Sequence, residues 1–379
     1  METDFLADKA GFIRRGILYG RAAPGDDGDM RAALRETPME SWISTSMERE
    51  PSFFGPDGKP GKSVPMTART AELPHELAGL YGCSSMRIHI NGAAAAACYL
   101  EGLRLRKKFR GRVDILKGGF ESIPLLAPEV KEASMVFTSV ASDNRPARRI
   151  LEAGVRGMPR YSLLGELETF AIGTGAARNY GLLEAASSVD ARELAEFHNS
   201  SRIRVQLSPV LDESWLRGES AVGQPIRNFL VHRENGRIKA CVMVWDQRHH
   251  RQVVVRGYRQ PIAFTRPAYN LWALASGRPV LPPAGSRLEQ VFLAFIALDE
   301  SVDDAEFLVS LIKEALVRAK SMRACVALFG ISPKSVHRRA LKHKLNPWVY
   351  RTRIEAVELA ACRKPPEIEG VMQPEIALL

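Results

Sequence analysis

The chain has 379 residues. This length predicts two domains, because a domain usually takes about 100–200 residues. Apolar residues make up 45% and charged residues 25% of the sequence, which excludes a mainly disordered chain. The longest wholly apolar runs, 93–100 and 291–298, are far shorter than the roughly 20 residues of a membrane span. Charged residues interrupt the N-terminus at Glu2, Asp4 and Asp8, so we expect no signal peptide and a cytoplasmic protein.

The first half of the chain reads as alternating strands and helices. Residues 85–90 and 93–105 predict two strands joined by a hairpin at Asn91-Gly92. A helix follows from residue 113 and is expected to end before Pro124. Next come a short buried strand, 135–141, and a second helix, with Asn144 near its start and Gly154 as its end signal.

The second half repeats this order. A second hairpin is predicted at Asn235-Gly236, followed by a strand at 291–298 and an amphipathic helix at 302–319. A further strand and helix follow at 324–330 and 335–344. The repetition predicts an α/β (α+β) fold with two tandem domains. The proposed boundaries are 1–178, 179–362 with an insertion near 247–289, and an extended tail at 363–379. We expect the insertion to pack against the first domain and to line a substrate pocket with aromatic side chains, among them Tyr258, Phe264, Tyr269 and Trp272.

Cysteine and histidine positions do not suggest a metal site. The five cysteines are scattered without CxxC spacing, and we expect them to be reduced and mostly buried. The paired histidines His249 and His250 lie in a polar stretch, 245–252, that predicts a solvated hairpin. We therefore expect no metal.

The net charge of +10 favours an anionic partner, such as nucleic acid, an acidic membrane or a phosphorylated cofactor. Two basic runs carry much of this charge. The first contains Arg104, Arg106, Lys107, Lys108, Arg110, Arg112 and Lys117, and the second lies at 334–344. A strand that ends in a basic turn before a helix offers backbone N–H groups and cations to a phosphate. The first run has this arrangement, whereas the second reads as a solvated face.

The order YLEGLRL, FRGR and SDNRPARRILEAG resembles the GNAT acyltransferase superfamily. Together with SVPMTART, MPRYSLLGELETF, WDQRHHRQ, GYRQPIAFTRPAYN and NPWVYRTRIEAVEL, it resembles bacterial tandem GNAT proteins over roughly residues 16–360. This resemblance implies two GNAT-like domains, each with a mixed, mainly antiparallel sheet flanked by helices. It also implies that acetyl-CoA or another acyl-CoA is the cofactor.

The resemblance assigns the cofactor-binding residues by position. In the family a strand runs along the pantetheine arm, a turn wraps the pyrophosphate, and a later element carries an asparagine. The corresponding positions here are Leu103, Arg104, Leu105, Arg110, Gly111, Arg112, Val113 and Asn144. Asn144 has a second interpretation as a simple helix cap.

Three positions depart from the family pattern. Val113 and Ile115 stand where the family has glycines, and Asp114 between them would repel a pyrophosphate. Leu151 stands where the family often has a tyrosine that acts as general acid. In the second half the corresponding turn, LDESVDD, is acidic, so we expect it not to bind CoA.

Acyl transfer to an amine needs a base for the amine and an acid for the leaving group. Glu101 is the candidate base, with an ordinary ion pair to nearby arginines as its alternative role. Tyr161 is the candidate acid, with a structural role as its alternative.

The sequence thus predicts an acyl-CoA-dependent N-acyltransferase whose N-terminal domain is catalytic. The expected partner is a small-molecule or peptide amine, with no membrane partner and nucleic acid unfavoured. The alternatives are an aminoacyl or N-acyl amino acid synthase on the same fold, a catalytically degenerate CoA-binding or regulatory protein, and a nucleic-acid-binding protein that uses the basic runs. The amine, the acyl chain length and the oligomeric state are left open.

Overall fold

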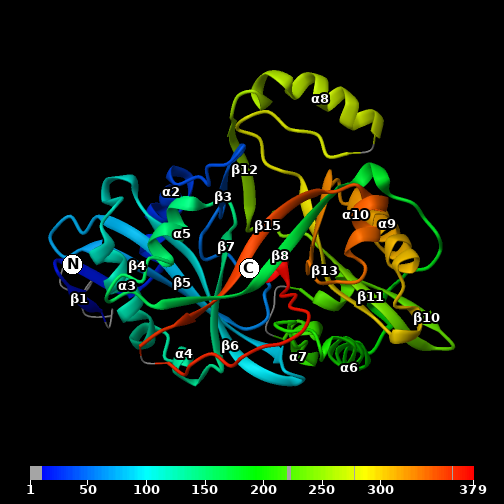
Figure 1. The fold of residues 1–379 in the computed structure, drawn as a ribbon, viewed down its shortest axis with the longest axis horizontal. Coiled ribbons are helices and arrows are strands. Elements are labelled where there is room, and N and C mark those ends of the chain that lie inside the picture. Colours follow the sequence, from blue (N-terminus) through cyan, green and yellow to red (C-terminus); the bar gives the residue numbers. More distant parts are fainter. Residues whose placement is uncertain (1–10, 220–222, 277, 361) are drawn as a thin grey trace.

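The computed structural model describes residues 11–219, 223–276, 278–360 and 362–379. Its first half forms a twisted sheet with helices against it (Figure 1). The elements of this half are β1 (Phe12–Arg14), β2 (Ile17–Arg21), η1 (Pro24–Asp26), α2 (Asp27–Glu36), β3 (Ile43–Glu48), β4 (Lys62–Thr70), β5 (Leu77–Ile90), β6 (Ala93–Leu105), η2 (Lys107–Phe109), α3 (Val113–Leu126), α4 (Glu129–Glu132), β7 (Met135–Ala141), α5 (Arg145–Leu151) and β8 (Arg160–Gly173).

From β13 onward, the second half follows the order that the first half follows from β6 onward, a strand, a helix, a strand, a helix and a final strand, whereas β12 and α8 come between its hairpin and β13. Its elements are η3 (Thr174–Ala176), β9 (Glu184–Ala185), η4 (Ala186–Ser188), α6 (Ala191–Arg202), α7 (Glu213–Arg217), η5 (Pro225–Asn228), β10 (Phe229–Glu234), β11 (Arg237–Trp245), β12 (Gln252–Tyr258), α8 (Ile262–Ser276), β13 (Gln290–Leu298), η6 (Glu300–Val302), α9 (Ala305–Ser321), β14 (Val326–Ile331), α10 (Arg338–Leu345), β15 (Trp348–Glu358) and η7 (Ile376–Leu378).

The two halves share one sheet because they exchange their last strands. The strand order is β1-β2-β4-β5-β6-β7-β15-β8-β14-β13-β11-β10-β9. The final strand of the second half, β15, pairs with β7 of the first half, and β8 pairs with β14 of the second. β15 and β8 also pair with each other and run side by side through the middle of the molecule (Figure 1). The arrangement is a mixed α/β fold with a large, mostly antiparallel sheet flanked by helices, as expected from the sequence.

The hydrophobic core lies in several clusters against this sheet. Helix α3 covers one cluster in the first half, and α9 and α10 cover another in the second. The largest cluster spans both halves, under α6, α7 and the C-terminal segment. A smaller cluster lies between α2 and β5.

Both Asn-Gly hairpins are confirmed. Asn91 and Asn235 have positive φ angles of 51° and 50°, and the glycine after each is positive too, as a tight hairpin turn requires. The strands and helices predicted after each hairpin are also present. The end predicted for the helix at residue 113 is wrong, because α3 continues through Pro124 to Leu126. Pro124 lies in the last turn, and the helical bond from Ala127 N to Ile123 O (2.8 Å) forms beyond it.

The solvated hairpin predicted at residues 245–252 is also wrong. β11 and β12 belong to different sheets, and Gln247 and His250 are buried. Gln247 donates to Ala377 O (2.9 Å), so the C-terminal segment covers this turn. A contact this distant in the sequence left no local signal.

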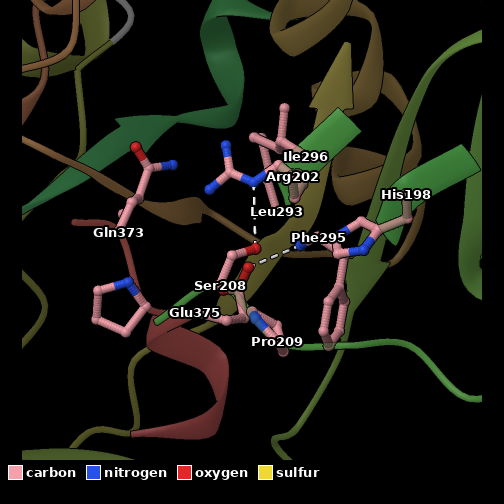
Figure 2. Close-up of a pocket in the computed structure, with 11 residues that line it drawn as sticks. His198, Arg202, Ser208, Pro209, Leu293, Phe295, Ile296, Gln373 and Glu375 are labelled. Carbon is pink, nitrogen blue, oxygen red and sulfur yellow. Dashed lines mark hydrogen bonds between the residues drawn. The ribbon is translucent and has the colours of Figure 1, made fainter. Parts of the chain in front are cut away.

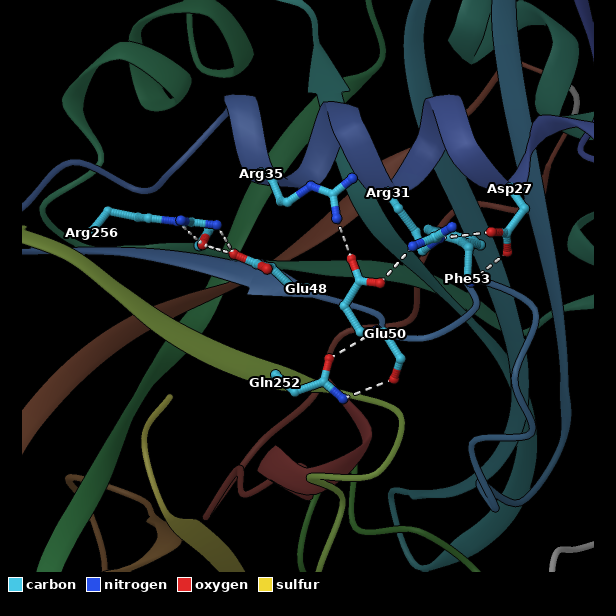
Figure 3. A network of polar contacts seen from close by, with 9 residues as sticks. Asp27, Arg31, Arg35, Glu48, Glu50, Phe53, Gln252 and Arg256 are labelled. Carbon is cyan, nitrogen blue, oxygen red and sulfur yellow. Dashed lines mark hydrogen bonds and ion pairs between the residues drawn. The ribbon is translucent and has the colours of Figure 1, made fainter. Parts of the chain in front are cut away.

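The inserted segment packs against the first half, as expected, but the expectation that its aromatic side chains line a substrate pocket is wrong for Phe264 and Trp272, which are exposed on α8. β12 pairs with β3, from Gln252 opposite Glu48 to Tyr258 opposite Ile43. Figure 3 shows the polar contacts around this junction. Gln252 exchanges two hydrogen bonds with the backbone of Glu50, whose carboxylate accepts from two arginines of α2.

Residues 363–379 run as irregular chain back to the centre of the molecule. Met372 forms an isolated parallel β-bridge with Gln206. Ile376, Ala377 and Leu378 are buried. Among the described residues, no helix is long and apolar enough to cross a membrane.

Candidate functional site

The candidate site lies where β6 and β7 part. They pair in parallel only from Ala97 opposite Met135 to Leu100 opposite Thr138. Beyond this point β6 pairs only with β5, and β7 pairs only with β15, on its other edge. We call this place the β6/β7 fork. The edge of β6 that faces the fork therefore offers backbone N–H and C=O groups to an extended ligand.

A bulge at Gly102 changes which side chains of β6 face the fork. Gly102 has φ +70°, and the register with β5 shifts between Leu80 and Gly82. As a result, Leu100 and Leu105 both pack towards α3 although they are five residues apart. Leu103 is 38% exposed. A positive φ favours glycine here, and no strand periodicity predicts the position of the bulge.

The turn after β6 leads into the N-terminus of α3. Phe109 is buried and anchors this turn, and Gly111 has φ +84°. Arg110 is exposed, and its side chain has no hydrogen bond or ion pair among the described residues. The first turn of a helix carries backbone N–H groups and the positive end of the helix dipole. Arg110 and this helix end can therefore act together on an anion.

Arg112 differs from Arg110 because its charge is already paired. Its guanidinium donates two hydrogen bonds to the Asp114 carboxylate, at 2.8 and 2.7 Å. The bonds from Arg112 lower the pKa of Asp114, so this carboxylate is ionised at neutral pH. Val113, between the two, opens α3 as its first residue. Of the two arginines predicted to bind pyrophosphate, the structure leaves Arg110 available and holds Arg112 in a local pair.

We expect Asp114→Asn to tighten acetyl-CoA binding by about threefold to tenfold, because it removes a negative charge and releases Arg112. Titration calorimetry would measure the change, which should be larger at low salt. Glu121→Gln, on the same helix two turns further on, is the matched control and should change affinity little. Weaker binding by Asp114→Asn would show that this carboxylate supports the turn rather than opposing the ligand.

Three of the seven cations in the first run, Arg106, Lys108 and Arg112, are paired with nearby carboxylates. Arg106 pairs with Glu36 at 2.7 Å, and Lys108 pairs with Glu76. Arg104 lies on β6, and burial lowers its pKa. The run therefore presents less positive charge to solvent than the sequence suggests, which weakens the case for a nucleic-acid footprint.

Glu101 lies at the fork in a buried polar cluster. Its carboxylate accepts hydrogen bonds from Ser84 and from Ser63 (3.0 Å), and it pairs with Lys59 at 3.4 Å. Burial would raise the pKa of Glu101, but the charges of Lys59 and Arg49 and the two hydroxyls outweigh it and lower the pKa to about 2. Glu101 is thus ionised, and a carboxylate with so low a pKa is a weak proton acceptor.

Tyr161 lies on the other side of the sheet. Its ring packs edge-on against Phe120 of α3, with ring centroids 6.3 Å apart, and burial raises its pKa. Glu101 faces the opposite side, towards Lys59 and Leu378. The structure therefore does not bring the two candidate catalytic residues together. Asn144 caps α5 at the end of β7, where its side chain accepts from Ala147 N at 3.2 Å.

Tyr99 is a candidate that the sequence analysis missed. Its hydroxyl is 2.6 Å from Ser139 Oγ of β7, and it joins the two strands at the fork. Burial raises its pKa to about 12. Side chains two residues apart in a strand lie on the same face of the sheet. The sequence could therefore have predicted that Tyr99 lies beside Glu101, the candidate base.

The second half has a corresponding fork, and the chain itself fills it. β13 and β14 pair only from Gln290 to Phe292, and Phe295 then bulges with φ +52°. Figure 2 shows the pocket beyond this point, where the Glu375 carboxylate accepts from Phe295 N at 2.7 Å. Gln373 also enters, and its side-chain oxygen accepts from Ser332 N at 3.2 Å.

The turn after β13 is occupied by its own acidic residues. Asp304 caps α9 by accepting from Glu306 N and Phe307 N, at 2.8 and 2.9 Å. Asp299 caps η6 and pairs with Lys239 at 2.9 Å. These carboxylates occupy the backbone N–H groups that an anion would need.

The fold is similar to solved acyltransferase structures. N-myristoyltransferase from Saccharomyces cerevisiae, with bound myristoyl-CoA, matches 96% of this chain and 87% of its own, with a TM-score of 0.62 and 10% identity. The chain has a GNAT fold. A GCN5-related N-acetyltransferase from Sphaerobacter thermophilus matches 94% of this chain and 99% of its own (TM-score 0.53, 13% identity).

A third similar GNAT structure belongs to a larger protein. It is the GCN5-related glucosamine N-acetyltransferase region of a fungal multi-domain β-N-acetylglucosaminidase, and the match covers 91% of this chain but 38% of that one, with a TM-score of 0.56 and 10% identity. No family model and no curated protein matches the sequence. At sequence identities this low, the similarity establishes the GNAT fold, and the activity has to be inferred from the residues of the site.

Proposed function

We propose that the protein is an N-acyltransferase that transfers an acyl group from acyl-CoA to an amine, with the acyl-CoA held by the first half. The observation that carries this proposal is the contrast between the two forks. At the first, the edge of β6 leads to an unpaired Arg110 and the N-terminus of α3. At the second, Glu375 and the Asp299 and Asp304 carboxylates take the corresponding donors.

The residues present fit an acyl-CoA. When bound, this group supplies an acyl chain activated as a thioester. Arg110 and the first turn of α3 are suited to the phosphates, and residues 101–105 of β6 to the extended amide-bearing arm. Leu103, which is 38% exposed, adds apolar surface beside this edge, and Leu105 packs towards α3. Asn144 contributes by fixing the start of α5 at the end of β7.

The amine is expected to meet the acyl group near Glu101 and Tyr99. An ionised Glu101 attracts a cationic amine and orients it, whereas its low pKa limits its share in removing the proton. The Tyr99 hydroxyl is a hydrogen-bond donor on the same face. Tyr161, on the α3 side, is the proposed proton donor to the leaving thiolate.

Calorimetric titration with acetyl-CoA and with a long-chain acyl-CoA should give one site per chain. Arg110→Ala should weaken this binding by about 1.5–3 kcal/mol, the range for a charge-assisted hydrogen bond. Arg237→Ala is the matched control, because Arg237 is exposed at the hairpin of the second half. Two equal sites, or unchanged affinity in Arg110→Ala, would contradict the assignment.

A catalytically degenerate CoA-binding protein is the second candidate, favoured by the Arg112–Asp114 pair and by the low pKa of Glu101. Thiol release from acyl-CoA in the presence of a panel of amines separates the two. Stoichiometric binding without thiol release on any amine would favour the degenerate protein. A cytoplasmic location belongs to the same proposal, since acyl-CoA is a cytoplasmic metabolite.

A further inference from the structure

Helix α8 exposes apolar side chains along its outer face. It lies at the edge of the molecule, apart from the sheet (Figure 1), and among its described residues only Ala273 is buried. The largest exposed side chains are Phe264 at 75%, Leu271 at 75%, Leu274 at 72% and Trp272 at 51%. Pro267, Ala268 and Ala275 are exposed too. Positions 264, 267, 268, 271, 274 and 275 follow helical spacing, so they form one apolar stripe.

Three polar side chains of α8 point inwards, whereas Thr265 and Ser276 are exposed. Tyr269 donates to Pro279 O (3.0 Å), and Arg266 donates to Leu281 O (3.3 Å). Asn270 exchanges hydrogen bonds with the backbone of Leu281, at 2.9 and 2.8 Å. A helix at a protein surface normally shows the reverse pattern, with its apolar stripe towards the body. Specific hydrogen bonds therefore hold the apolar stripe of α8 outwards.

The surroundings of this stripe are positively charged. Residues 247–288 contain seven arginines and no aspartate or glutamate, although Arg248, Arg256 and Arg287 pair with acids outside this stretch. Arg259 is exposed just before α8, and its backbone N–H donates to the carbonyl of Trp42, a residue that is itself 60% exposed. Arg278, just after α8, lies 4.8 Å from the ring centroid of Trp272 and bonds to Asn346 at the end of the basic helix α10.

This combination fits a lipid surface better than a protein groove. Interfacial helices carry Trp, Phe and Leu on one face with cations beside them, and they bind by burying the apolar face at the headgroup boundary. Arg259 and Arg278 have no ion pair with the described residues, so their charges can complement anionic headgroups. We propose that α8 docks the protein on a membrane surface that contains anionic lipids, with the apolar stripe inserted and Arg259 and Arg278 at the phosphates.

This proposal revises one expectation from the sequence. No membrane partner was expected because the chain has no apolar run long enough to span a bilayer. A helix that lies in the interface needs no such run. The docking is independent of the acyltransferase assignment, since it uses none of the residues at the fork.

Co-sedimentation of the full chain with vesicles tests the proposal. We expect binding to phosphatidylcholine vesicles that contain phosphatidylglycerol, weaker binding to phosphatidylcholine alone, and a decrease with salt. The triple variant Phe264→Gln/Leu271→Gln/Leu274→Gln should lose more than about tenfold in affinity, since it removes three inserted apolar side chains. Arg259→Gln/Arg278→Gln should reduce the preference for the anionic vesicles.

The matched control replaces three exposed apolar residues elsewhere, Leu73, Leu125 and Val336, by glutamine and should leave binding unchanged. Circular dichroism checks that every variant is folded. Full vesicle binding by the α8 triple variant would overturn the proposal. It would also be overturned if the wild-type protein ignored vesicles and formed an oligomer that the triple variant dispersed, because the stripe would then be a contact between copies.

Discussion

Replacing Lys59 by methionine is expected to destabilise the protein by about 3–5 kcal/mol at pH 7, the usual cost of leaving one member of a buried ion pair alone. Lys59 is 8% exposed and Glu101 17% exposed in their side chains, and Lys59 also donates to Leu378 O at 3.2 Å. Urea unfolding of both proteins would measure the difference. The double variant Lys59→Met/Glu101→Leu should recover most of the loss, because it removes both charges.

The pH dependence provides a second measurement. In the native protein the pKa of Glu101 is about 2, below its value of about 4.3 in an unfolded chain. The contribution of this depressed pKa to stability is therefore present above about pH 4.3 and is lost as the pH falls towards 2, on the order of 3 kcal/mol. In Lys59→Met the unfolding free energy should fall less steeply over this acid range. The same pH dependence in the variant as in the wild type would show that Lys59 does not keep Glu101 ionised.

Replacing Trp215 by alanine is expected to cost about 3–5 kcal/mol, the range for truncating a large buried aromatic side chain. Trp215 of α7 is 1% exposed, and its ring centroid lies 5.5 Å from that of Phe295 and 6.2 Å from that of Trp245. Its Nε1–H donates to Gly58 O at 3.0 Å, next to Lys59. The change thus removes packing in the second half and a link to the first.

Two variants sharpen this measurement. Trp215→Phe keeps an aromatic ring but loses the hydrogen bond to Gly58, and should cost less than the alanine variant. Trp272→Ala removes a tryptophan that is 51% exposed, and should cost clearly less than Trp215→Ala, because it loses only the contacts with Tyr269 and Arg278. Equal losses in Trp215→Ala and Trp272→Ala would contradict the proposed role of the buried ring.

The site at the β6/β7 fork was only partly predictable. The basic turn and the helix cap at Asn144 could be predicted, because a strand, a turn and a helix start are local features of the sequence. The pairing of Arg112 with Asp114 was also local, yet charge alone did not indicate which of the two arginines would stay available. The proposed roles of Glu101 and Tyr161 came from the order of the elements along the chain. That order does not show on which side of the sheet each side chain lies.

The sequence by itself determined the elements and the resemblance to a GNAT fold. Apolar periodicity and the two Asn-Gly turns depend on contacts between near neighbours, so they can be read along the chain. The tertiary structure decided the rest. The exchange of β8 and β15 between the halves, the entry of Glu375 into the second fork and the burial of Gln247 under Ala377 join residues far apart in sequence. The outward apolar stripe of α8 was decided in the same way. The helical spacing of its apolar residues is visible in the sequence and shows that they share one face of the helix. Only the inward hydrogen bonds of Tyr269 and Asn270 show that this face is turned towards solvent.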